Sequence, residues 1–131
     1  MNYLWIGLGS ALGGIARFWL SGIVARMLGA TFPWGTLIVN ITGCAFIGFF
    51  AALTGPDGRL LAGAPLRQFV MIGICGGYTT FSSFSLETLN LAREGEWMRA
   101  GGNILLSVVL CLAGVRLGYM LAAQWNQTRG L

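Results

Sequence analysis

The chain has 131 residues and a formal net charge of +4, and 56% of its residues are hydrophobic whereas only 9% are charged. Soluble domains carry about 25% charged residues, so this composition indicates a membrane protein and leaves too little polar sequence for a large domain in water. The sequence contains no histidine, which excludes an imidazole base or metal ligand. Its cysteines lie in separate apolar segments at unrelated spacings and predict neither a disulfide framework nor a metal site: Cys44, Cys75 and Cys111.

Four apolar segments are each long enough for the roughly 20 residues that cross a bilayer core. They cover residues 4–28, 34–53, 66–91 and 100–123. The connectors between them are short and contain turn-forming and charged residues. We therefore expect an all-α membrane protein in which residues 1–131 form a single four-helix transmembrane domain.

The first segment contains Arg17 near its centre. A guanidinium at that depth is too far from either interface to snorkel easily, so it needs a water-filled cavity or several carbonyl partners. Two compatible interpretations remain open: Arg17 clamps the carbonyls of a broken helix, or it attracts anions.

The second segment carries Thr36 and Asn40 near its start, four residues apart and hence on one helix face. The Asn40 amide offers two uncharged N–H donors, which can replace water around an anion without trapping it. An interhelical hydrogen bond is the alternative role for this side chain.

The third segment contains GGYTTFSSF at residues 76–84, in which Gly76 and Gly77 precede Thr79 and Thr80 near the segment centre. Glycine pairs loosen helices, and non-helical backbone at membrane depth is tolerated only inside protein or beside water. The third helix is therefore expected to be broken at its centre.

Phe81 and Phe84, three residues apart, would share one face of the resumed helix. An aromatic ring has a positive edge that can hold an anion, although ordinary packing explains the same spacing. For Glu87, later in this segment, we expect a partner among the arginines at the interface.

The fourth segment places Asn103, Ser107 and Cys111 on one face, at intervals of four residues. They predict a polar stripe about 12 Å long, which either forms a wetted track or consists of small packing residues. Arg116 lies nearer the segment end, where snorkelling accounts for it.

Arginine is balanced between the two sides that four spans would define: Arg59, Arg67 and Arg129 on one, and Arg26, Arg93 and Arg99 on the other. The positive-inside rule then favours neither orientation. We expect insertion in both orientations and an antiparallel homodimer, unless a chaperone or unseen partner sets the topology. Two small-xxx-small pairs are available for packing of the assembly, Gly9 with Gly13 and Gly114 with Gly118.

Three motifs, GGIARF at residues 13–18, PWGTLIVNITG at 33–43 and GICGGYTTFSSF at 73–84, resemble the signatures of the small fluoride channels called Fluc or CrcB. The resemblance covers essentially the whole chain in order. The departures are mild: Phe18 and Ser83 stand where Tyr and Thr are common.

This resemblance implies passive, fluoride-selective export from the cytoplasm, which lowers fluoride toxicity, by an antiparallel homodimer with two pores in a bacterial inner membrane. Its expected partners are a second copy, fluoride and the lipid bilayer, and not nucleic acid. Phe81, Phe84 and Asn40 would line the pores, and Ser107 would belong to the polar track of the fourth helix. The backbone carbonyls of Gly76 and Thr79 would bind a structural Na⁺ at the dimer centre.

We expect Thr36 and Ser107 to offer hydroxyl groups to the anion, and Arg17 to bias the path toward anions. A small multidrug exporter of dual topology is the main alternative, but it needs a carboxylate in the first segment. An enzyme is disfavoured because the chain contains no nucleophile–base constellation. An accessory subunit of a larger complex would be distinguished by reconstituting the pure protein.

Overall fold

The computed structural model describes residues 2–128, so Arg129, which enters the charge comparison, lies outside the described residues. Every regular element between residues 2 and 128 is helical. Four helical segments are long and apolar enough to cross a membrane: Asn2–Leu28, Trp34–Leu53, Ala64–Arg93 and Trp97–Thr128. The prediction of an all-α protein with four membrane-capable helices is confirmed.

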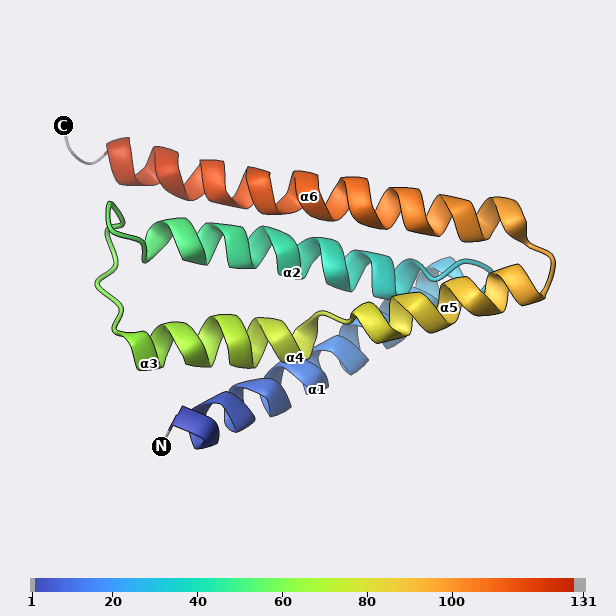
Figure 1. Ribbon diagram of the computed structural model, residues 1–131, viewed down its shortest axis with the longest axis horizontal. Coiled ribbons are helices and arrows are strands. Elements are labelled where there is room, and N and C mark those ends of the chain that lie inside the picture. Colours follow the sequence, from blue (N-terminus) through green and yellow to red (C-terminus); the bar gives the residue numbers. More distant parts are fainter. Residues whose placement is uncertain (1, 129–131) are drawn as a thin grey trace.

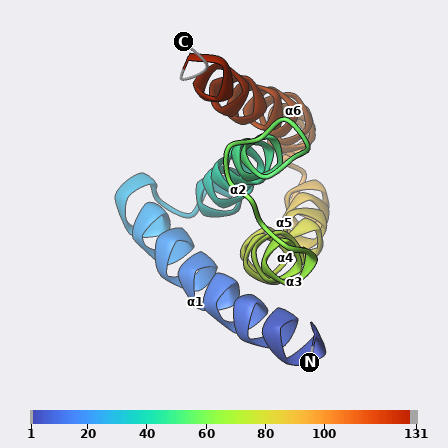
Figure 2. The same cartoon turned by 90° about the vertical axis from the view of Figure 1, so that its left-hand side faces the viewer.

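Three of these segments are continuous helices, namely α1 (Asn2–Leu28), α2 (Trp34–Leu53) and α6 (Trp97–Thr128). The remaining segment consists of α3 (Ala64–Arg67), the π-helix η1 (Gln68–Cys75), α4 (Gly76–Tyr78) and α5 (Phe81–Arg93). In Figure 1, α6, α2 and the α3–α5 segment run side by side, and α1 crosses them obliquely. Figure 2, seen along the helices, shows α2 between α1 and α6.

Close helix packing within the chain uses the small-xxx-small pairs. A Cβ on Gly9 or Gly13 would collide with the backbone of η1, one on Gly118 would collide with the backbone of α2, and one on Gly114 would lie 3.1 Å from the Ile41 carbonyl oxygen of α2. The expectation that these pairs serve the assembly of copies is therefore wrong. Their lack of side chains lets α1 approach η1 and α6 approach α2 at backbone distance.

Helical backbone stops at Tyr78 and starts again at Phe81, and the two residues between are extended. Thr79 has φ −81° and ψ 155°, and Thr80 has φ −149° and ψ 114°. The Thr79 hydroxyl donates to the Cys75 carbonyl at 2.8 Å, and the Thr80 hydroxyl accepts from the Ser83 N–H at 3.1 Å. The threonines thus take over backbone groups at both helix ends, as capping side chains do. We call residues 79–80 the TT link.

The connector between α2 and α3, residues 54–63, is held in place by Arg59 within it and by Arg67 at the end of α3. Arg67 Nη1 donates to the Thr54 carbonyl at 2.7 Å and to its hydroxyl at 2.6 Å, which caps the end of α2. The Arg59 N–H donates to Asn126 Oδ1 at 3.2 Å, and Asn126 Nδ2 donates to the Ala52 carbonyl at 3.1 Å. These bonds tie the ends of α2 and α6 to the start of the third segment.

Candidate functional site

A groove of about 470 Å³ lies beside the TT link, between α2, the third segment and α6. It is lined by six of the predicted site residues, namely Asn40, Gly76, Thr79, Phe81, Phe84 and Ser107. No Asp, Glu or Arg among the described residues lines this groove. An ion in it would meet amide, hydroxyl, carbonyl and aromatic groups rather than a fixed charge.

Asn40 and the TT link are joined by two hydrogen bonds. Asn40 Nδ2 donates to the Thr80 carbonyl at 3.0 Å, and the Thr80 N–H donates to Asn40 Oδ1 at 2.8 Å. The interhelical interpretation of Asn40 is therefore correct for its oxygen and for one of its two N–H donors. The other N–H has no partner between residues 2 and 128, and it remains available at the groove.

Phe81 and Phe84 lie together at the start of α5, with ring centroids 5.4 Å apart and planes inclined at 54°. Phe81 is 79% exposed, so its ring is not part of the core of this chain. Packing inside the chain therefore does not explain Phe81. Both rings line the groove at the level where Asn40 holds the TT link.

Two residues of the polar stripe of α6, Asn103 and Ser107, are buried, and Asn103 contacts α5. Asn103 is only 2% exposed, and its Nδ2 donates to Thr88 Oγ1 at 2.9 Å. The Thr88 hydroxyl donates to the Phe84 carbonyl at 2.7 Å, and the Ser107 hydroxyl donates to Asn103 Oδ1 at 3.3 Å. This chain of bonds connects the backbone of Phe84 to Ser107. Sequence reasoning missed Thr88, whose only signal is its position one turn after Phe84.

The other two predicted residues, Arg17 and Thr36, line a second cavity of about 250 Å³, which Thr80 of the TT link also lines. The Thr36 hydroxyl donates to Glu87 Oε1 at 2.7 Å, so the expected arginine partner of Glu87 is wrong. The reason is the fold: α2 passes α5 closely enough for Thr36 to reach this carboxylate first. Thr80 and Ser83 also line this cavity.

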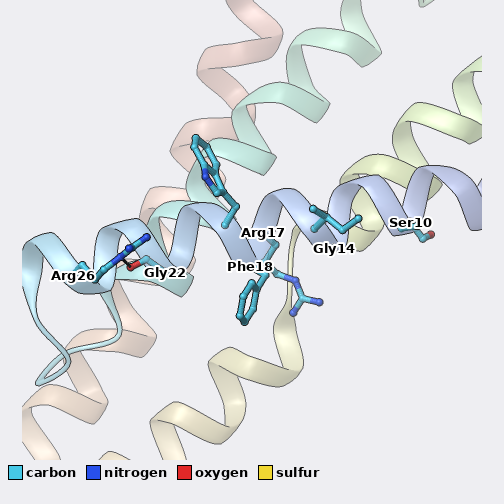
Figure 3. Close-up of a pocket in the computed structure, with 9 residues that line it drawn as sticks. Ser10, Gly14, Arg17, Phe18, Gly22 and Arg26 are labelled. Carbon is cyan, nitrogen blue, oxygen red and sulfur yellow. Dashed lines mark hydrogen bonds between the residues drawn. The ribbon is translucent and has the colours of Figure 1, made fainter.

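Two buried polar atoms, Arg17 Nε and Glu87 Oε2, have no hydrogen-bond partner within residues 2–128. Figure 3 shows the Arg17 side chain projecting from α1 beside Phe18, next to the coil between α4 and α5. No carbonyl in the described part of the chain accepts a hydrogen bond from Arg17. The carbonyl clamp is thus not formed, and a buried unpaired donor facing a polar cavity calls for water or an anion.

This cavity continues outward into a larger hollow of about 720 Å³. The two share Phe18, Ser21, Thr36 and Glu87, and the larger one is also lined by the connector of residues 29–33. The two adjoining hollows therefore lie between the connector of residues 29–33 and the TT link, with Arg17 lining the inner one.

The fold and these hollows define a small multi-pass membrane protein with polar side chains in hollows between its helices. The chain belongs to the family described as CrcB-like protein, Camphor Resistance (CrcB), which it matches over residues 4–119. The resemblance inferred from the three motifs is therefore confirmed.

Curated relatives match nearly the full chain, and each is named "Fluoride-specific ion channel FluC". One from Methylocella silvestris is 61% identical over 99% of this chain and 99% of its own length. One from Opitutus terrae is 60% identical over 98% and 97%, and one from Rhodospirillum rubrum is 56% identical over 97% and 98%. These relatives are channels by name and not enzymes. Their bacterial sources and the four helices make this chain a multi-pass protein of the bacterial inner membrane.

Proposed function

We propose that the protein is a fluoride-selective channel that passively exports fluoride from the cytoplasm and so lowers fluoride toxicity. The observation that carries the proposal is the groove beside the TT link, where Phe81, Phe84, Asn40 and Ser107 gather without a charged side chain. The names of its relatives support the choice of fluoride. Passive flow suffices because an inside-negative potential drives an anion outward with about 2.3 kcal/mol per charge per 100 mV.

Selectivity follows from how the groove replaces water around the ion. Fluoride is small and strongly hydrated, so a path that passes it must offer donors in place of that shell. The free Asn40 N–H and the positive edges of Phe81 and Phe84 can do so without a deep binding well, and the Ser107 hydroxyl can join them when it turns away from Asn103. Conduction needs this balance between entering and leaving.

Arg17 acts at the entrance in this proposal. Its unpaired Nε faces the cavity that leads to the TT link, and a guanidinium there raises the local concentration of anions. The Thr36 hydroxyl engages one oxygen of Glu87, which holds this carboxylate against α2. An anion on this route would meet Arg17 before it reaches the phenylalanines.

The working unit in this proposal is an antiparallel homodimer with two pores. The exposed ring of Phe81 at a groove in the membrane-spanning part favours a wall supplied by a second copy. The balanced arginines allow that copy to insert with the opposite orientation. Each groove would then form one pore, closed by the partner.

The TT link is proposed to break the third membrane helix at the bilayer centre and to hold a structural Na⁺ on the dimer axis. In an unbroken helix the Thr80 N–H would bond to the Gly76 carbonyl, but here it donates to Asn40. Likewise the Ser83 N–H donates to the Thr80 hydroxyl, which leaves the Thr79 carbonyl without that partner. The carbonyls of Gly76 and Thr79 thus fit a cation, and unwound carbonyls are the usual Na⁺ ligands in membrane transporters.

Reconstitution of the purified protein tests the channel function and also separates it from an accessory subunit. Liposomes loaded with fluoride or chloride are diluted into ion-free buffer, and release is followed with ion-selective electrodes after a potassium ionophore is added. Fast fluoride release with little chloride release is expected. Equal release of both anions, or no release from protein-containing liposomes, contradicts the proposal.

A further inference from the structure

The fold brings all three cysteines to one groove, although they lie on three different helices. Cys44 of α2, Cys75 of η1 and Cys111 of α6 are free thiols that line the groove beside the TT link. Cys44 and Cys111 belong to the neighbouring helices α2 and α6, which form two walls of this groove. Met71, one turn before Cys75, adds a thioether sulfur to the same groove.

Cys44 and Cys111 lie on α2 and α6, the pair of helices that packs most extensively. Near them, a Cβ on Gly114 would lie 3.1 Å from the Ile41 carbonyl oxygen, and one on Gly48 would collide with the Val115 carbonyl. Backbone contacts on either side therefore fix the spacing of α2 and α6. The two thiols therefore face the same groove from helices whose spacing is set before any ligand arrives.

Sulfur ligands select soft cations, and a pair of them suits the d¹⁰ ions that accept two ligands in a line. No three Cys, Asp or Glu side chains within residues 2–128 cluster closely enough to hold a metal ion. A tetrahedral four-ligand site is thus not formed by these residues, whereas a two-thiol site needs only Cys44 and Cys111.

We propose that Cys44 and Cys111 form a binding site for thiophilic d¹⁰ cations such as Hg²⁺, and that a cation bound there blocks the groove. Both thiols lose their protons: Hg²⁺ + 2 RSH → RS–Hg–SR + 2 H⁺. The charges of the cation and the two thiolates cancel, so the bound group is neutral and suits the uncharged lining of the groove.

Blockage follows from where the pair lies. Cys111 is one helical turn after Ser107, and both line the groove that contains Phe81 and Phe84. This consequence rests on the proposed fluoride conduction, whereas binding of the metal does not.

The test uses the purified full-length protein, chloride-free buffer and mercuric nitrate. Binding is followed by the ultraviolet charge-transfer absorbance of thiolate bound to Hg²⁺, and conduction by fluoride release from liposomes. Wild-type protein should saturate at one Hg²⁺ per chain and stop conducting, and excess dithiothreitol should restore release. Cys75→Ala is the matched control, because Cys75 lines the same groove outside the proposed pair, and it should respond like the wild type.

Cys44→Ala and Cys111→Ala should each lose the saturating absorbance, and at the Hg²⁺ concentration that stops the wild type each should release fluoride as fast as the same variant does without Hg²⁺. Elution as a single symmetric peak in size-exclusion chromatography checks that each variant is folded. One folded variant of the two is enough for the test. The proposal is overturned if Cys75→Ala abolishes the absorbance, or if neither other variant changes it. Metal binding that depends on Cys44 and Cys111 in a protein that conducts no fluoride would contradict the proposed function while leaving the metal site standing.

Discussion

Asn40 and Thr80 exchange two hydrogen bonds, at 3.0 and 2.8 Å, between a side-chain amide on α2 and the backbone of the TT link. Asn40 accepts the Thr80 N–H that an unbroken helix would bond to the Gly76 carbonyl. In doing so it frees the Gly76 carbonyl and keeps an N–H of Asn40 at the groove. One side chain thereby connects the shape of the third segment to the chemistry of the proposed pore.

Replacing Asn40 by Asp should abolish fluoride conduction and destabilise the protein. The carboxylate still accepts from the Thr80 N–H, but its second oxygen faces the Thr80 carbonyl without a proton to donate. Losing the part-buried hydrogen bond from Nδ2 costs about 1 kcal/mol, and the new charge repels anions. Fluoride release from liposomes and thermal unfolding in detergent measure the two effects.

Asn2→Asp is the control, because it makes the same chemical change at an exposed residue of α1 far from the groove. It should leave conduction and unfolding temperature close to those of the wild type. If Asn40→Asp also conducts normally, the hydrogen bonds between Asn40 and Thr80 are not required for fluoride conduction.

Phe81→Ile and Phe84→Ile should each preserve the assembly but greatly reduce fluoride release. Isoleucine keeps apolar character and roughly keeps volume, so packing is largely retained. It lacks the positive ring edge on which the proposed ion contact depends. Phe46→Ile makes the same change at an exposed ring of α2 outside the groove and should conduct normally. Near-normal flux in both groove variants would show that the rings serve packing.

The helices were predictable because lipid allows few ways to satisfy a backbone, and length with apolarity identifies them. The side-chain contacts of the candidate site were harder to predict from length and apolarity. Thr36 reaches Glu87 across 51 residues of sequence, and Asn40 reaches Thr80 across 40. Such pairs depend on which helix faces meet, and hydropathy alone does not determine them.

The cysteines and glycines illustrate the same limit. Unrelated spacings concealed that Cys44, Cys75 and Cys111 would meet at one groove. Gly9 and Gly13 carry a motif for close helix approach, but the motif does not say whether the partner helix belongs to the same chain. Here the partner is η1 of the same chain.

Insertion in both orientations is tested by labelling the connectors that join α1 to α2 and α5 to α6. In a cysteine-free background, Thr31→Cys and Glu94→Cys would place single thiols there, one per variant. Each should react with a membrane-impermeant maleimide from both sides of the membrane, in roughly equal amounts. The balanced arginines are the reason for this expectation. Labelling from one side only, at native expression, would show a single fixed topology.

Gly43→Ala should destabilise the TT link. A Cβ at Gly43 would collide with the Thr79 side-chain methyl and would lie 3.0 Å from the Tyr78 ring. Because Tyr78 also shares a 2.7 Å hydrogen bond with Thr42, the ring cannot move away without losing that contact. Overpacking of this kind typically costs about 1–3 kcal/mol, so the unfolding temperature and fluoride release should both fall.

Gly101→Ala is the matched control for this variant. A Cβ at Gly101, on α6, meets nothing within 4 Å. Alanine there should be neutral or stabilise the helix by up to about 1 kcal/mol, because glycine is the poorer helix former. Equal responses of the two variants would mean that contact with the TT link does not limit substitution at Gly43.

Removal of Na⁺ should weaken the assembly and stop conduction together. If the carbonyls of Gly76 and Thr79 from two copies share one cation, its loss leaves four carbonyl dipoles facing one another at the dimer centre. Purified protein exchanged into N-methyl-D-glucamine buffer should therefore unfold at a lower temperature than in Na⁺ and should dissociate more readily on dilution. Adding Na⁺ back should restore both properties in a saturable way, because a ligand that binds only the folded dimer stabilises it by mass action.

The proposed Na⁺ ligands are backbone atoms, which no substitution removes, so the informative comparison is with Gly43→Ala. This variant disturbs the TT link but keeps both carbonyls, and it should need more Na⁺ than the wild type to reach its full stability. If stability and fluoride release are the same in Na⁺ and in N-methyl-D-glucamine, the carbonyls freed by Asn40 and Thr80 serve some purpose other than holding this ion.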